Sequence, residues 1–233
     1  DSYGANSQGS QSPYERWGIT KNTLPIVAIN YGQNGIDPAI FHSDTETLQN
    51  SFIDVGASLA KFGYNVYYYA MAANDLDHVH HVYLETIKVL NTLRNAGEID
   101  FIPENRVHMM LYIPDTVRIL NLLSDAHFSI NYKLHGNVLS AAVRTPFISV
   151  CYHLKGLEFS RYIDESIEKK YSIRSDTIQS AGDFENALSS LHEDGEMERV
   201  SALLKQSIES TDSRYNEMIM QLLKDVVIRK FRA

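Results

Sequence analysis

The sequence predicts an α/β protein built on a doubly wound parallel sheet, Rossmann-like, with strand order 3-2-1-4-5. Short β-branched or aromatic runs alternate with longer amphipathic runs, which is the pattern of successive strand-helix units. The short runs are almost continuously apolar, as expected for parallel strands that are covered on both faces. The chain has 233 residues and 44% hydrophobic content, which is enough to bury one substantial core.

The elements follow in order after a polar first segment. Residues 1–24 are rich in Ser, Gly, Asn and Gln and are predicted to form a linker or N-terminal arm. The Rossmann-like domain is predicted over residues 25–192. Its strands are expected at 26–31, 65–69, 107–112, 126–131 and 147–152, and its helices at 45–62, 75–95, 115–123 and 134–144. Asp75 is placed to cap the second of these helices.

Residues 193–233 are predicted to form amphipathic helices that pack on the domain or on a partner lobe. The last apolar stripe recurs at steps of three and four residues: Tyr215, Met218, Ile219, Leu222, Leu223 and Val226. Such spacing gives a helix one apolar face that needs a partner surface.

Composition excludes several classes of protein. The net charge of -8 and the scattered basic residues argue against a nucleic-acid-binding protein. No apolar run approaches the roughly 18 residues that span a bilayer, and the first residues do not resemble a signal peptide, so a cytoplasmic location is expected. The single cysteine, Cys151, is expected to be a core residue. His78, His80 and His81 are expected on a solvated helix face rather than in a metal site.

Cationic residues end two of the predicted strands. Lys133 and His135 follow the fourth strand where a helix begins, and Lys155 follows the fifth. A helix N-terminus presents unpaired N–H groups and partial positive charge, so the sequence predicts a site for phosphate or carboxylate. The loop Gly32-Gln33-Asn34-Gly35 should face it, because the carboxyl ends of strands one and four meet at the switch point.

A purely structural role also remains possible for each of these residues. The two loop glycines also fit an ordinary turn, His135 also fits a helix-start residue bonded to backbone, and Lys155 also fits a solvated turn lysine. There is no G-x-G-x-x-G and no P-loop, so a dinucleotide or nucleoside triphosphate site of the usual kind is not supported.

The same segments resemble a known family. The segments are Asn74-Asp75-Leu76-Asp77-His78, Lys133-Leu134-His135, 141–146 and Tyr152-His153-Leu154-Lys155. Together they resemble the carboxy-terminal half of the polysaccharide pyruvyl transferases, with matching order and spacing from about Ile26 to Leu191. Three positions depart from the family pattern. The family usually has arginine at Lys133, Asp-Pro at His153-Leu154, and often an arginine at Tyr31-Gly32. A lysine cannot make the bidentate fork of an arginine.

The resemblance implies one Rossmann-like lobe of a two-lobed, GT-B-like transferase. Family members transfer the enolpyruvyl-derived group of phosphoenolpyruvate to saccharide hydroxyls and form a pyruvate ketal. On this basis His135 would be catalytic, protonating the methylene carbon or assisting phosphate departure. The residues expected to bind substrate are Lys133, Leu134, Gly136, Lys155, Tyr152, Gly32, Gln33 and Asn34. No metal and no tightly bound cofactor are expected, since phosphoenolpyruvate is a donor substrate.

Two other functions remain open at this point. A nucleotide-sugar-dependent GT-B-type glycosyltransferase would hold a diphosphate on the same cationic loops. A non-catalytic glycan- or protein-binding domain would need no donor at all. In the transferase interpretations the partners are a saccharide acceptor and a second Rossmann-like lobe or neighbouring domain.

Overall fold

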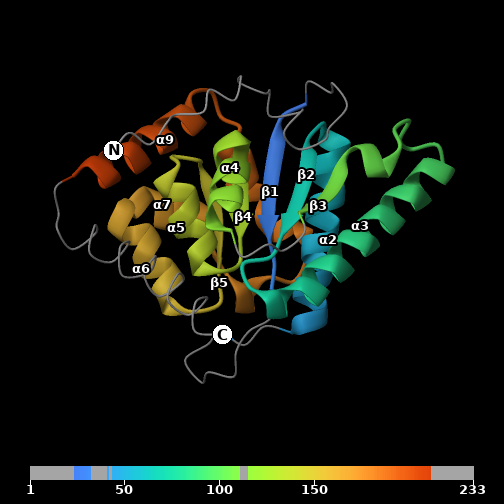
Figure 1. Cartoon of the computed structure of the whole chain (residues 1–233), viewed down its shortest axis with the longest axis horizontal. Helices are drawn as coiled ribbons and strands as arrows, with labels where there is room; N and C mark the ends of the chain where they lie inside the picture. Colours follow the sequence, from blue (N-terminus) through green and yellow to red (C-terminus); the bar gives the residue numbers. More distant parts are fainter. Residues whose placement is uncertain (1–23, 33–40, 42–43, 111–114, 211–233) are drawn as a thin grey trace, which may run out of the picture.

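The chain folds around one open parallel sheet with helices on both sides (Figure 1). The computed structural model describes residues 24–32, 41, 44–110 and 115–210. The six strands lie in the order β3-β2-β1-β4-β5-β6. Their bounds are β1 Ile26–Asn30, β2 Asn65–Tyr69, β3 Val107–Met110, β4 Ala126–Asn131, β5 Phe147–Cys151 and β6 Ser172–Arg174. The predicted order 3-2-1-4-5 is confirmed, and β6 extends it.

The helices alternate with the strands. Their bounds are α2 Thr45–Phe62, α3 Leu76–Asn95, α4 Thr116–Asp125, α5 Leu134–Ala142, α6 Leu154–Ile163, α7 Glu165–Tyr171, α8 Glu185–Leu191 and α9 Glu196–Glu209. Short 3-10 turns lie at η1 Ala73–Asp75, η2 Pro103–Asn105, η3 Ser175–Thr177 and η4 Ala181–Phe184. No helix of the described ranges is both long enough and apolar enough to cross a membrane.

Several element ends differ from the sequence prediction. Asp75 makes no side-chain cap at the start of α3, and its carboxylate pairs with a lysine instead. The helix predicted to reach Arg144 ends at Ala142, because Arg144 adopts a φ of 63° that no α-helix continues. β1 and β5 each stop one residue short of the expected Tyr31 and Tyr152. Residues 111–114 lie outside the described part of the chain.

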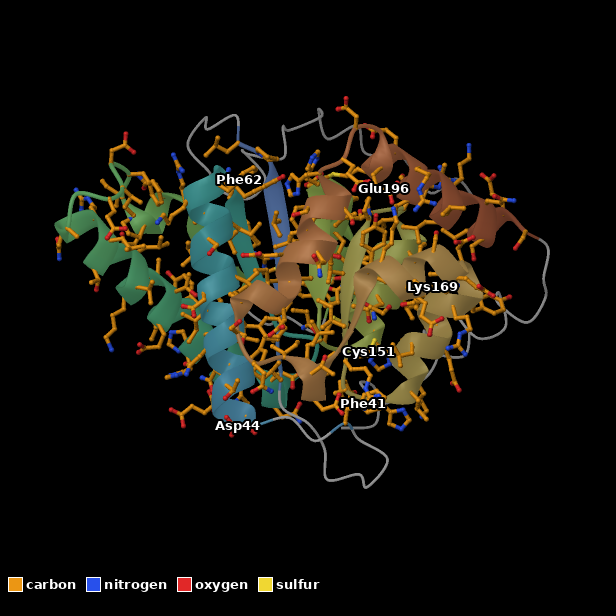
Figure 2. All side chains as sticks on the ribbon, turned by 180° about the vertical axis from the view of Figure 1, so that it is seen from behind. Phe41, Asp44, Phe62, Cys151, Lys169 and Glu196 are labelled. Carbon is orange, nitrogen blue, oxygen red and sulfur yellow. The ribbon has the colours of Figure 1, made fainter. Side chains whose placement is uncertain are left out.

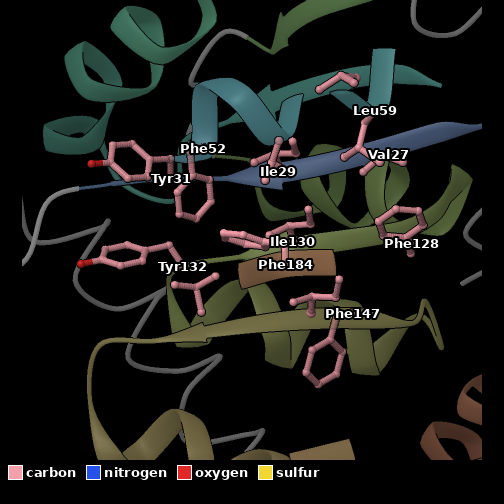
Figure 3. Packing of buried hydrophobic residues seen from close by; sticks show 14 of the residues in the cluster. Val27, Ile29, Tyr31, Phe52, Leu59, Phe128, Ile130, Tyr132, Phe147 and Phe184 are labelled. Atoms are coloured by element: carbon pink, nitrogen blue, oxygen red, sulfur yellow. The ribbon is translucent and has the colours of Figure 1, made fainter. Parts of the chain in front are cut away.

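Strand residues alternate between two apolar layers. Ile26, Ala28, Tyr67 and Tyr69 pack against α4 and α5, which lie in front of the sheet in Figure 1. Residues of the opposite parity pack with α2, α3 and α8 in the larger cluster: Val27, Ile29, Val66 and Tyr68. Figure 3 shows this larger core, in which Tyr31 and Tyr132 extend beyond the aliphatic residues with their hydroxyls pointing to the same end.

The helix α9 belongs to the same packed body. Its Val200 and Leu204 are fully buried in the larger core cluster, and Glu196 at its start binds Tyr171 and Arg199. A buried carboxylate in a polar network of this kind fixes α9 against α7. The predicted stripe from Tyr215 to Val226 lies outside the described residues.

Candidate functional site

The carboxyl ends of β1 and β4 are joined by one buried asparagine. The Oδ1 of Asn30 accepts a hydrogen bond from the backbone N–H of Lys133 at 2.9 Å, and its Nδ2 donates to the carbonyl of Tyr69 at 3.0 Å. The backbone N–H of Tyr132 donates to the carbonyl of Asn30 at 3.1 Å. These bonds fix the turn that leads from β4 into α5. A polar residue at the end of a buried strand is the signal that sequence reasoning missed.

Lys133 is held on the side of this turn that faces β1. Its Nζ lies 3.3 Å from Oδ1 of Asp75, and the exposed fractions of the two side chains are 17% and 1%. The same ammonium lies 5.6 Å from the centre of the Tyr152 ring. A Cβ added to Gly32 would lie 2.7 Å from Cε of Lys133 and would also clash with Asp75. Gly32 therefore allows the pair to form, which gives this glycine a steric role. Asp75 was expected to be a cap and is instead the counter-charge of Lys133.

Gly136 packs against a buried polar network beneath α5. The hydroxyl of Tyr69 donates to Oδ1 of Asn131 at 2.7 Å, and Nδ2 of Asn131 donates to Ser129 and Ser140. A Cβ added to Gly136 would lie 2.9 Å from Oδ1 of Asn131. Glycine is therefore needed for the first turn of α5 to approach the end of β4.

A cavity of about 240 Å³ opens between α5, β5 and α6. It is lined by Tyr132, Leu134, Asn137, Ser149, Val150, Cys151, Tyr152, His153, Lys155 and Gly156. Figure 2 labels Cys151 at the same end of the molecule as Asp44, which caps the start of α2, and opposite to Phe62, which ends that helix. The cavity thus lies at the carboxyl edge of the sheet, where open α/β sheets bind ligands.

The structure does not bring all the predicted site residues to one place. The cavity brings together Leu134, Tyr152 and Lys155, while Lys133 and Gly32 lie at the ion pair with Asp75. His135 is half-buried at the second position of α5 and is not among the lining residues. Helix geometry explains this, because residues three apart share a face and adjacent ones do not, so Leu134 faces the cavity together with Asn137. Gln33 and Asn34 lie outside the described residues.

Phe41 is held beside the cavity by hydrogen bonds to two other segments. Its backbone N–H donates to the carbonyl of Tyr152 at 2.8 Å, and its carbonyl accepts from Oγ of Ser175 at 3.2 Å. The guanidinium of Arg174 lies 4.3 Å from the centre of its ring. Figure 2 shows Phe41 below Cys151 at this end of the molecule. These contacts connect the end of β6 to the rim of the site.

Burial sets the protonation of the groups around the cavity. Burial raises the pKa of the Cys151 thiol to about 11, although hydrogen bonds from serines oppose it, so this cysteine stays a neutral thiol at neutral pH. Burial, together with the negative charge of Asp75, raises the pKa of the Tyr152 hydroxyl. No cluster of three or more potential metal ligands occurs in the described part of the chain.

Two helix N-termini point positive partial charge towards the cavity. Leu134 and Asn137 come from the first turn of α5, and Lys155 and Gly156 come from that of α6. At α6 the backbone N–H of Lys155 is capped by Nδ1 of His153 at 3.1 Å. The arrangement suits an anionic ligand at the mouth of the cavity.

A family model described as polysaccharide pyruvyl transferase matches residues 14–153. No curated protein matches significantly.

Three solved structures match the chain at low sequence identity. A glycosyltransferase from Rickettsia africae ESF-5 is 12% identical with a TM-score of 0.53, over 92% of this chain and 50% of that chain. The E. coli ADP-heptose lps heptosyltransferase II is 14% identical with a TM-score of 0.44, over 83% and 50%. An alpha,alpha-trehalose-phosphate synthase from Burkholderia vietnamiensis is 12% identical with a TM-score of 0.46, over 95% and 50%. The chain therefore spans about half the length of these structures.

Proposed function

The chain belongs to the polysaccharide pyruvyl transferase family, and from this we propose that it serves in the transfer of a pyruvyl group from phosphoenolpyruvate to hydroxyls of a saccharide. The observation that supports the proposal is a cavity at the carboxyl edge of the sheet that is lined by the first turns of α5 and α6 and by Lys155, with Lys133 beside its lining residue Tyr152. A donor with a phosphate and a carboxylate needs several cationic groups close together.

We expect the two lysines of the site to have different roles, because within the described part of the chain only Lys133 is paired with a carboxylate. Asp75 already offsets part of the charge of Lys133, so Lys133 serves mainly to position one anionic group of the donor. Lys155 is exposed at the mouth of the cavity. Together with the N–H groups of the two helices, its ammonium balances most of the remaining negative charge.

We propose that His135 carries the proton that starts the reaction. Its imidazolium gives the proton to the methylene carbon of phosphoenolpyruvate, and C2 bonds to the oxygen of a saccharide hydroxyl, whose proton returns to the imidazole. The bond from C2 to the phosphate oxygen then breaks, and a second hydroxyl attacks C2 and loses its proton to the departing phosphate. The products are a ketal with two carbon–oxygen bonds to the sugar and free phosphate. Histidine suits both proton steps because its pKa lies near neutrality.

The proposal includes a second lobe, because the chain spans half the length of the solved structures that it matches. The acceptor is expected to lie between the lobes, where both can hold it in line with the donor. We place the reaction in the cytoplasm, since a donor with this much charge does not cross a membrane unaided.

The experiment is a comparison of His135→Ala with the wild type in the complete protein that contains this chain. Phosphate release and the mass increase of the saccharide by one pyruvate ketal would be followed together. We expect the rate to fall by roughly a hundredfold, the usual scale for a lost general acid, with a melting midpoint that moves by less than about 2 °C. His80→Ala, at an exposed histidine on α3, is the matched control and should keep full activity. A His135→Ala protein with normal melting and full activity would remove the histidine from the mechanism.

A further inference from the structure

The cavity between α5, β5 and α6 has a floor whose chemistry differs from that of its mouth. We propose that this cavity is the subsite for one sugar ring of the acceptor, and that Oδ1 of Asn137 accepts a hydrogen bond from a hydroxyl of that ring. The inference rests on the proposed saccharide acceptor and adds where the acceptor binds.

The amide of Asn137 uses its nitrogen within the protein and leaves its oxygen for a ligand. The side chain is 1% exposed, and its Nδ2 donates to Oγ of Ser149 at 2.6 Å. Oγ of Ser149 in turn lies 3.1 Å from Sγ of Cys151, so this chain of bonds fixes the amide. No hydrogen-bond donor for Oδ1 of Asn137 is found among the described residues. A buried carbonyl oxygen of this kind needs a hydrogen-bond donor from a ligand or from ordered water, and this one belongs to a residue that lines a cavity.

An acceptor atom at the floor selects against the donor substrate. Ionised phosphoenolpyruvate carries a phosphate and a carboxylate, which both accept hydrogen bonds and donate none. A sugar hydroxyl donates one and satisfies Oδ1 of Asn137. Lys155, at the N-terminus of α6, is exposed at the mouth of the cavity, whereas Asn137 is buried. Floor and mouth therefore suit two different ligands.

The walls and the size of the cavity fit a single sugar ring. The rings of Tyr132 and Tyr152 lie 5.0 Å apart, and Leu134 completes an apolar wall. A sugar ring has apolar C–H faces and polar edges, so a wall of this kind above a polar floor matches its two surfaces. The volume of about 240 Å³ is smaller than the roughly 300 to 1,000 Å³ of sites for larger ligands. The cavity therefore holds one ring rather than an oligosaccharide.

The subsite adjoins the proposed proton donor. Asn137 follows His135 by two residues in α5, which is a rise of about 3 Å along the helix axis. The two side chains leave the helix on different faces. A ring in the cavity thus lies beside the donor site rather than in it, as a reaction between two substrates requires.

The test uses the full chain, labelled with ¹⁵N, and two neutral probes, methyl α-D-glucoside and methyl β-D-galactoside. The side-chain amide signal of Asn137 is assigned by its loss in Asn137→Leu. We expect at least one glycoside to shift this signal, and phosphoenolpyruvate to leave it in place. In Asn137→Leu the dissociation constant of that glycoside should rise about tenfold, the upper range for one hydrogen bond. The dissociation constant of phosphoenolpyruvate should stay within about twofold.

Two further variants separate binding from folding. Asn137→Asp keeps the size and an acceptor oxygen, so it should bind the glycoside more tightly than Asn137→Leu. Asn65 is the matched control. It is fully buried, its Oδ1 also finds no donor among the described residues, and it does not line this cavity. Asn65→Leu should leave glycoside binding unchanged.

The titrations with the glycosides, phosphoenolpyruvate and inorganic phosphate can give three different results. A shift of the Asn137 signal by phosphoenolpyruvate or inorganic phosphate, and by neither glycoside, would overturn the subsite and make the cavity an anion site. No shift with any probe at high millimolar concentration would also overturn it. Glycoside binding without any binding of phosphoenolpyruvate would uphold the subsite and contradict the proposed donor instead.

Discussion

The ammonium of Lys133 lies 3.3 Å from a carboxylate oxygen of Asp75, and this ion pair connects the end of β4 to the start of α3. Asp75 is 1% exposed and Lys133 is 17% exposed, so water screens the pair only weakly. The lysine that follows β4 is therefore fixed in direction before any substrate binds. Such preorganisation favours an anionic group placed at one defined point of the sheet edge.

Removal of the negative charge of Asp75 should destabilise the protein. Asp75→Asn keeps the shape of the side chain but leaves the lysine without its carboxylate. We expect the free energy of unfolding to fall by about 1 to 3 kcal/mol, less than for a fully buried pair because Lys133 retains some contact with solvent. Urea denaturation would measure this. Asp77→Asn, at an exposed residue on the same helix, should change it by less than about 0.5 kcal/mol. Equal small effects would show that the pair contributes nothing to stability.

Gly136 should not tolerate a methyl group. A Cβ there would lie 2.9 Å from Oδ1 of Asn131 and 3.0 Å from the hydroxyl of Tyr69. We expect Gly136→Ala to destabilise the protein by about 1 to 3 kcal/mol, because the first turn of α5 must move away from the buried network. Thermal unfolding would measure the loss. Gly182→Ala is the control, since a Cβ there meets only Oγ of Ser180 at 3.3 Å. A Gly136→Ala protein as stable as the wild type would contradict the close approach of α5.

Glu196 should make stability depend on pH in the acid range. Hydrogen bonds from Arg199, Tyr171 and Lys170 lower its pKa from 4.5 to about 2, although burial opposes this. As pH falls, the unfolded chain takes up the proton first, so the stabilisation present above pH 4.5 is lost between 4.5 and about 2.

Urea denaturation across this window should therefore show a falling free energy of unfolding in the wild type and a flatter curve in Glu196→Gln. At pH 7 the same substitution should cost about 2 to 3 kcal/mol. Glu193→Gln, at an exposed glutamate near the start of the same helix, should cost less than about 0.5 kcal/mol. Parallel curves for the wild type and Glu196→Gln would show that this carboxylate does not drive the acid response.

The periodicity of the sequence was sufficient to predict most strands and helices, because buried parallel strands and amphipathic helices leave different patterns. The common doubly wound topology then gave the sheet order. It did not predict β6, since Ser172–Arg174 is three residues long and has no apolar run. It also assigned Asp75 to a helix cap. In the sequence, a helix cap and the partner of a distant lysine look the same, because each is an acidic residue before an amphipathic helix. Only the fold brings Lys133 close enough to Asp75 to form the ion pair.

The sequence predicted those residues of the candidate site that directly follow a strand. Lys155 and Tyr152 follow β5 directly, and both line the cavity. Asn137 was not predictable, because an asparagine inside a helix has no local signal, and its importance comes from Ser149 on a different element. Asn30 carries a local signal, a polar residue at the end of a buried strand, but its partners lie 39 and 103 residues away, so its role was not evident from the sequence.

We propose that the carboxyl edge of this sheet binds phosphoenolpyruvate as the donor. Calorimetry of the full chain with phosphoenolpyruvate and, separately, with uridine diphosphate distinguishes this donor from a nucleotide-sugar. We expect phosphoenolpyruvate to bind with a dissociation constant at least about tenfold lower than that of uridine diphosphate. Tighter binding of uridine diphosphate would favour a nucleotide-sugar donor, and binding of neither would favour a domain without a donor site. Either result would show that phosphoenolpyruvate is not the donor at this site.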